Sequence, residues 1–72
     1  MNSLRLFTDG GARGNPGPAG IGMVIEDEAG QLLWEGSDYL GRATNNQAEY
    51  RALIAGLTKV REWAPEWLEV FL

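Results

Sequence analysis

Residues 7–20 read FTDGGARGNPGPAG, and the organisation of the chain follows from this stretch. From Leu4 to Asp9, which overlaps the start of this stretch, residues of two sets alternate as they do in a strand. The sets are Leu4, Leu6 and Thr8 and, between them, Arg5, Phe7 and Asp9, and the alternation stops at Gly10-Gly11. Six of the ten glycines lie in residues 10–22, which predicts a shaped turn that leads into a second strand over residues 21–25. No Gly-Lys-Ser/Thr follows, and the next element is a strand, so the stretch does not match a nucleotide-binding loop. Taken alone, these glycines have a plainer interpretation, in which they only permit tight turns.

The middle of the chain predicts a hairpin followed by a helix. Residues 27–30 have the composition of a hairpin loop, and residues 31–40 can continue as a third, antiparallel strand. Residues 44–47, TNNQ, fit a capping box at the start of a helix. The apolar residues that recur at helical spacing after it are Tyr50, Leu53, Leu57 and Val60. We expect this stripe to pack on the sheet.

The end of the chain predicts a last strand parallel to the first. Pro65 biases the residue before it away from helical angles and so closes a helix of about 18 residues. Residues 68–72 are mostly apolar and form the final strand. A right-handed crossover through the helix then makes this strand parallel to residues 4–9. The expected fold class is α/β, with a mixed sheet and one long helix.

Composition leaves carboxylate chemistry as the main option. The 72 residues include no Cys and no His, which removes zinc–thiolate sites, Cys or Ser–His nucleophiles and histidine proton transfer. The net charge is −4, but two bases against one acid give residues 1–25 a net +1, while four bases against nine acids give residues 26–72 a net −5. A polyanion should therefore approach the N-terminal third. No apolar run is long enough to span a membrane, so we expect a cytoplasmic protein with a single domain over residues 1–72.

Two acidic residues are expected to converge. Asp9 ends the first strand, at the edge of the sheet where ligands usually bind. Glu49 lies in the second turn of the helix, and helical side chains lean toward the N-terminus. Because the helix must run antiparallel to the first strand to return the chain, its start lies near Asp9. Two carboxylates there would suit a hard cation such as Mg²⁺, although each acid taken singly is more simply an exposed surface charge.

Two segments together resemble the first two signature segments of type 1 ribonuclease H. They are residues 7–20, FTDGGARGNPGPAG, and residues 44–49, TNNQAE. The resemblance extends over the whole chain as the family's N-terminal half. It implies a ribonuclease H-like sheet, an antiparallel meander of three strands, one long helix and a fourth strand, in the order 3-2-1-4. It also implies cleavage of the RNA strand of RNA/DNA hybrids by two metal ions, with Mg²⁺, or Mn²⁺ in its place.

The resemblance assigns roles by position. Asp9 resembles the carboxylate that bridges both metals, and Glu49 the one that binds one metal and a ribose 2′-hydroxyl. The positions that resemble nucleic-acid contacts are Gly10, Gly11, Asn15, Arg42, Thr44, Asn45 and Asn46. The glycine backbone and the first asparagine resemble contacts to RNA 2′-hydroxyls, and the paired asparagines resemble readers of the hybrid's minor groove. The arginine and threonine match positions that hold a phosphate of the DNA strand.

The chain also departs from the family pattern. The family's third carboxylate lies at or just past the end of the fourth strand and its fourth comes later, so both fall beyond Leu72, as does the fifth strand. Three interpretations remain open: a ribonuclease H-type nuclease module completed by self-association or by a complementing C-terminal half, a non-catalytic folding or assembly fragment, and a hybrid-binding module with weak metal affinity. Because the last strand is an apolar edge, we expect the chain to self-associate.

Overall fold

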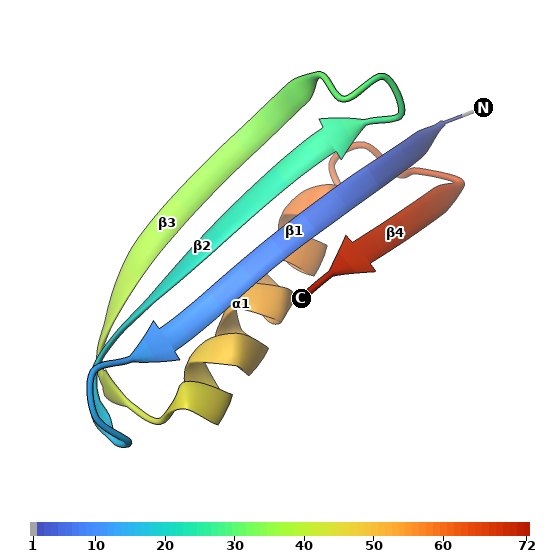
Figure 1. The fold of residues 1–72 in the computed structure, drawn as a ribbon. Helices are drawn as coiled ribbons and strands as arrows, with labels where there is room; N and C mark the ends of the chain where they lie inside the picture. The colour runs from blue at the N-terminus through green and yellow to red at the C-terminus, as the bar shows by residue number, and fades with distance from the viewer. Residues whose placement is uncertain (1) are drawn as a thin grey trace.

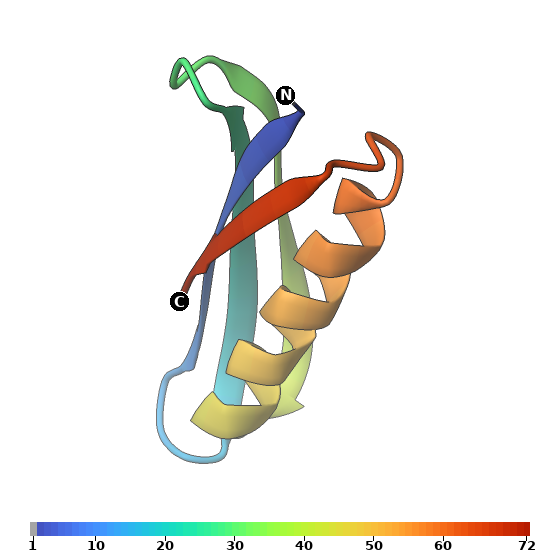
Figure 2. The ribbon, with the colours of Figure 1, turned by 90° about the vertical axis from the view of Figure 1, so that its right-hand side faces the viewer.

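The structure is a computed structural model that describes residues 2–72, and it contains one sheet and one helix. Its elements in chain order are β1 (Ser3–Ala12), β2 (Gly17–Asp27), β3 (Leu32–Ala43), α1 (Asn45–Val60) and β4 (Trp67–Phe71). The sheet has the order β3-β2-β1-β4, with β1 antiparallel to β2 and parallel to β4. This confirms the predicted topology. Figures 1 and 2 show α1 lying across one face of the sheet, and within residues 2–72 nothing covers the other face.

The predicted turn over residues 10–22 was wrong for most of its length. β1 continues through Gly10 and Gly11 to Ala12, and β2 already begins at Gly17. The true turn is residues 13–16, closed by a hydrogen bond of 2.8 Å from the Arg13 N–H to the Pro18 carbonyl. Of the six glycines only Gly14 lies in this turn, at a positive φ of 82°, and the other five lie in strands. Among these, Gly10 permits the close approach of other backbone.

The predicted stripe on the helix was wrong for two of its four residues, while Val60 is buried and Leu53 is half-buried. The residues of α1 that are buried are Ala48, Ala52, Gly56 and Val60. Tyr50 and Leu57, which we expected against the sheet, are 68% and 39% exposed. The small residues let α1 approach the sheet so closely that a Cβ at Gly56 would come within 2.7 Å of Leu6 Cδ1. Small side chains such as alanine and glycine contribute little to a pattern of hydrophobic residues, so the predicted stripe was made of the larger apolar residues.

The core lies between α1 and the meander in two adjoining clusters. One cluster joins Leu4, Leu6, Ile25 and Val60, and the other joins Ala19, Ile21, Met23, Ala48 and Ala52. The first cluster takes alternate residues of β1 and one of β2, and the second takes alternate residues of β2, as expected for a sheet with one covered face. The helix ends earlier than predicted: Val60 is its last residue, and residues 61–66 form turns and irregular backbone before β4. Within residues 2–72, no helix has the length and apolar composition needed to cross a membrane.

Candidate metal and nucleic-acid site

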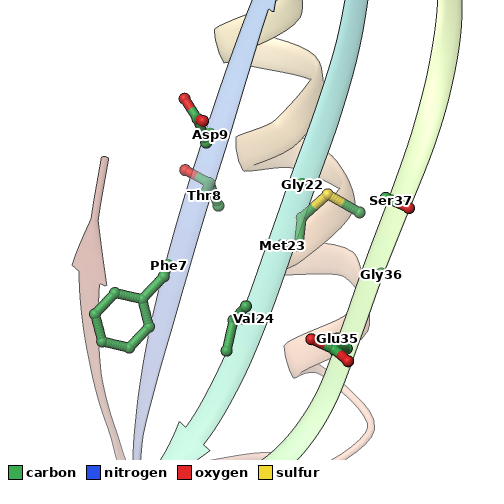
Figure 3. Close-up of a pocket in the computed structure, with 9 residues that line it drawn as sticks. All are labelled: Phe7, Thr8, Asp9, Gly22, Met23, Val24, Glu35, Gly36 and Ser37. Atoms are coloured by element: carbon green, nitrogen blue, oxygen red, sulfur yellow. The ribbon is translucent and has the colours of Figure 1, made fainter.

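Asp9 lies on β1 just beyond the stretch that pairs with β4. The last β1–β4 pair joins Phe7 to Phe71, whereas on its other side Asp9 pairs with Gly22 of β2. The side chain is exposed, and Figure 3 shows its carboxylate pointing away from β2 and β3. The early end of the β4 ladder therefore leaves the β4 side of β1 open at Asp9.

Gly10 brings this part of β1 against the start of α1. A Cβ at Gly10 would overlap the Ala48 carbonyl and come within 2.8 Å of the Glu49 amide nitrogen. Only a residue without a side chain fits at this contact. The close approach places Glu49, in the second helical turn, beside the strand that carries Asp9.

The two carboxylates line a single hollow of about 480 Å³ between β1 and α1. Its lining residues are Thr8, Asp9, Gly10, Asn46, Glu49, Tyr50, Leu53 and Leu72. No Lys or Arg lines it, and the ion pairs within residues 2–72 join other residues, Arg5 to Glu69 and Lys59 to Glu62. The expected convergence of Asp9 and Glu49 is therefore observed, and neither charge is neutralised within the described chain.

The donor set of this hollow fits a hard divalent cation. Two carboxylates and the amide oxygen of Asn46 are the kind of oxygen ligands that Mg²⁺ accepts alongside several waters. Residues 2–72 hold no group of three or more acidic side chains that could bind a metal. The described residues therefore offer part of a coordination sphere.

The other side of Asp9 borders a second hollow, on the sheet face away from α1 (Figure 3). Its floor is bare at Gly22, where a Cβ would meet nothing within 4 Å, and Phe7, Val24 and Glu35 stand at one end. The Phe7 ring stacks on Phe71 with centroids 4.8 Å apart. Asp9 thus stands between the two hollows, at the boundary of the covered and open faces.

A capping box forms the start of α1, as predicted. The Gln47 N–H donates to Thr44 Oγ1 at 3.1 Å, and the Thr44 N–H donates to Gln47 Oε1 at 2.8 Å. The Thr44 hydroxyl hydrogen is still free to donate, since the oxygen acts as the acceptor. The cap therefore leaves Thr44 able to bind an anion at the helix N-terminus.

Two of the three predicted asparagines, Asn15 and Asn45, lie together at the junction of the turn and the helix. The Asn45 N–H donates to Asn15 Oδ1 at 3.0 Å, and the Ala12 N–H donates to Asn45 Oδ1 at 2.8 Å. Asn46 lies apart from this pair, in the hollow with Glu49. Of the two predicted glycines, Gly11 is exposed, while Gly10 packs against α1.

Arg42 lines a groove between the end of β3 and α1, and this groove contains a residue that the sequence did not indicate. The groove is lined by Leu40, Arg42, Ala43, Gln47, Tyr50, Arg51 and Ile54. Arg51 is exposed there and has no ion-pair partner within residues 2–72. Its spacing of four residues from Gln47 was the available signal, because residues i and i+4 share a helix face.

Comparisons with known proteins give one consistent family. The family model described as "Reverse transcriptase-like" matches residues 7–71. Ribonuclease HI of Halobacterium salinarum is 48% identical over 67 residues, which cover 93% of this chain and 34% of that protein. LC11-RNase H1, solved in complex with RNA/DNA hybrid, is 52% identical with a TM-score of 0.87, over 93% of this chain and 51% of that one.

A third relative is also similar in structure. The N-terminal RNase H domain of rv2228c from Mycobacterium tuberculosis is 44% identical with a TM-score of 0.90, over 97% of this chain and 51% of that one. The chain thus spans about half of the two solved chains and a third of the archaeal relative.

Proposed function

The chain belongs to the type 1 ribonuclease H family, and we propose that it forms the part of such an enzyme that binds RNA/DNA hybrid and supplies two metal-binding carboxylates. The observation that carries this proposal is the shared hollow of Asp9 and Glu49, which holds no basic residue. The hybrid bound by LC11-RNase H1, which is 52% identical, supports the substrate class.

Asp9 and Glu49 would hold Mg²⁺ or Mn²⁺, with Asn46 beside them. In this site two ions would supply an activated water and stabilise the leaving oxygen. Two carboxylates are too few to bind two ions tightly, so we expect cleavage only where further oxygen ligands are added. A second copy of the chain, a complementing chain or the substrate phosphates would be their source.

Hybrid binding would use both sides of the α1 N-terminus. The backbone at Gly11 and the side chains of Asn15, Asn45 and Asn46 would face the RNA 2′-hydroxyls and the minor groove. On the other side, Arg42 and Thr44 would hold a phosphate of the DNA strand, where the helix dipole also favours negative charge. Because the net charge of the chain is −4, we expect this binding to be weak and sensitive to salt.

The decisive test compares a labelled RNA/DNA hybrid with a DNA duplex of the same sequence in Mg²⁺. We expect tighter binding to the hybrid, and any cleavage to be lost in Asp9→Asn and Glu49→Gln, because each removes a metal-binding charge. Asp38→Asn is the matched control, since it removes an exposed acid of β3 outside the hollow. Equal affinity for the two duplexes, or cleavage by Asp9→Asn at the parental rate, would overturn the proposal.

A non-catalytic assembly fragment is the second candidate, and the exposed apolar surface favours it. Trp67, Phe71 and Leu72 in and after β4 are 61%, 42% and 87% exposed. Tyr50 and Ile54 on α1 are 68% and 64% exposed. Exposed apolar residues clustered on neighbouring elements are typical of interaction surfaces. Assembly without Mg²⁺-dependent cleavage, at concentrations where the chain binds hybrid, would favour this candidate.

A further inference from the structure

Tyr50 is the residue that joins the two hollows beside α1. Among residues 2–72, it alone lines both the hollow of Asp9 and Glu49 and the groove that contains Arg42. The first of these lies between α1 and β1, and the second lies between α1 and the end of β3. Because β2 separates β1 from β3 in the sheet, the two hollows flank α1 on opposite sides, with Tyr50 between them.

The Tyr50 side chain is accessible to a ligand. It is 68% exposed, whereas Ala48 and Ala52 take the buried side of the helix. Asn46 and Ile54 lie four residues before and after it, so the three side chains share one helix face. Asn46 lines only the hollow of the carboxylates, and Ile54 lines only the groove of Arg42. We call these three residues, Asn46, Tyr50 and Ile54, the ridge, and its centre is an aromatic ring.

The two hollows determine which part of the hybrid meets the ridge. In the proposed function, the RNA backbone lies at Asp9 and Glu49, and a phosphate of the DNA strand lies at Arg42 and Thr44. The minor groove between the two backbones must then cross the ridge. The group of the DNA strand that follows this phosphate toward the groove is a deoxyribose, so this sugar lies nearest to Tyr50.

The wall that meets this sugar is largely apolar. Apart from its two arginines and Gln47, the groove is lined by Leu40, Ala43, Tyr50 and Ile54. A deoxyribose presents a CH₂ group at C2′, whereas a ribose carries a hydroxyl there. A hydroxyl that loses water without gaining a hydrogen bond is unfavourable, and the face of an aromatic ring supplies no comparable partner. The wall therefore favours a sugar that has no 2′-hydroxyl.

We propose that Tyr50 is a specificity-determining residue whose ring contacts a deoxyribose of the DNA strand and disfavours a ribose in its place. This inference rests on the proposed function and extends it to the second strand. The 2′-hydroxyls of the RNA strand distinguish hybrid from DNA duplex. Tyr50 distinguishes hybrid from RNA duplex, because it acts on the strand that is not cut.

The experiment compares the affinities for one RNA strand paired either with DNA or with RNA of the same sequence. We expect the parent to bind the hybrid about tenfold more tightly than the RNA duplex, since an exposed apolar wall rejects an added hydroxyl only moderately. Tyr50→Ala should lose most of this ratio, and Tyr50→Phe should keep it because the ring remains. A change in the folded fraction affects both affinities equally, so it leaves their ratio unchanged.

Tyr39→Ala is the matched control. Tyr39 is a tyrosine with nearly the same exposure, 70%, and it lines neither the hollow of the carboxylates nor the groove of Arg42. Its replacement should leave the ratio at the parental value. An unchanged ratio in Tyr50→Ala, or an equal loss in Tyr50→Phe and Tyr50→Ala, would overturn the ring contact.

A chemical change in the second strand separates the hydroxyl from the shape of the duplex. Sugars with 2′-fluorine favour the pucker of ribose but carry no hydroxyl. We expect the parent to bind RNA paired with such a strand nearly as tightly as the hybrid. Binding as weak as that of the RNA duplex would overturn the inference, while preference for hybrid over DNA duplex still stands. If the parent does not prefer hybrid over DNA duplex at all, the proposed function itself fails.

Discussion

Gly10 shows how one residue without a side chain sets the geometry of the site. Its pairing with Ile21 keeps it inside the ladder, and its hydrogen faces the backbone of α1 at Ala48 and Glu49. The obstacle to a larger residue is backbone, which cannot rotate aside as a flexible side chain does. Any residue other than glycine must push β1 and α1 apart, and with them Asp9 and Glu49.

We expect Gly10→Ala to lower the free energy of unfolding by about 1–3 kcal/mol, as in other overpacked sites. Gly22→Ala is the matched control, because a Cβ there would meet nothing within 4 Å. This control should change the free energy by about 0.5 kcal/mol or less. Urea unfolding of both variants measures the difference. Equal, small effects would show that β1 and α1 separate at no cost.

At the scale of elements, the two faces of α1 have different roles. Its small residues pack on the sheet, while Tyr50, Arg51 and Ile54 form one wall of the groove that also contains Arg42. Two arginines on one groove can hold a phosphate jointly, one from β3 and one from α1.

We expect Arg51→Ala and Arg42→Ala each to weaken hybrid binding, on the order of tenfold at low salt, and to lower the salt dependence by about one phosphate contact. The effect should be the same for different base sequences, since phosphates carry no sequence information. Arg61→Ala is the control, because Arg61 is an exposed arginine at the opposite end of the same helix. Titration of each of the three variants with hybrid at several salt concentrations gives the slope of log affinity against log salt concentration. Equal slopes for Arg51→Ala and Arg61→Ala would exclude Arg51 from the interface.

The elements also show what the sequence could predict. The capping box at Thr44 and Gln47 is a local pattern with one geometry, and the structure confirms it. The parallel direction of β4 relative to β1 and the convergence of Asp9 with Glu49 follow from the crossover, and the structure contains both. The strand order was implied by the resemblance to type 1 ribonuclease H, and the structure confirms it. The sequence could not predict where β1 ends and β2 begins. Local propensity does not distinguish a glycine in a turn from a glycine that a helix packed on the strand requires. The hydrogen bond from the Asn45 N–H to Asn15 Oδ1 joins residues 30 positions apart, and no local pattern predicts it.

At the scale of the whole molecule, one helix on a four-stranded sheet leaves much apolar surface uncovered. β4 is an edge strand, and its only charge, Glu69, is paired with Arg5 at 3.6 Å. An antiparallel pairing of two β4 strands centred on Val70 would set Glu69 opposite Phe71 of the second copy and avoid a Glu–Glu contact. This register adds Leu68 and Leu72 as a facing pair, so the edge is complementary to itself.

We expect the chain to self-associate, with a mass above 7.9 kDa at high concentration that falls on dilution. Val70→Lys should shift the equilibrium to monomer, because a charge at the centre of an edge strand opposes pairing. Thr58→Lys adds the same charge on exposed α1 surface and should leave the equilibrium unchanged. Light scattering after size exclusion over a tenfold dilution range measures this. A mass of 7.9 kDa at every concentration, with a cooperative melt, would exclude self-association.

The pairing of β1 with β4 also determines the order in which a growing chain can fold. Trp67 pairs with Ser3, so β4 leaves the ribosome long after β1, the strand that it lies beside. The 64 residues from Ser3 to Trp67 take about 3–13 s at typical rates of synthesis. During this time β1, β2, β3 and α1 can assemble, while the edge of β1 that later pairs with β4 stays unpaired. Arg5 is then an unpaired charge on this open edge of β1, where a charge disfavours pairing with a wrong strand. When β4 arrives, Glu69 neutralises the same arginine, and the residue that protected the nascent edge becomes part of the finished sheet.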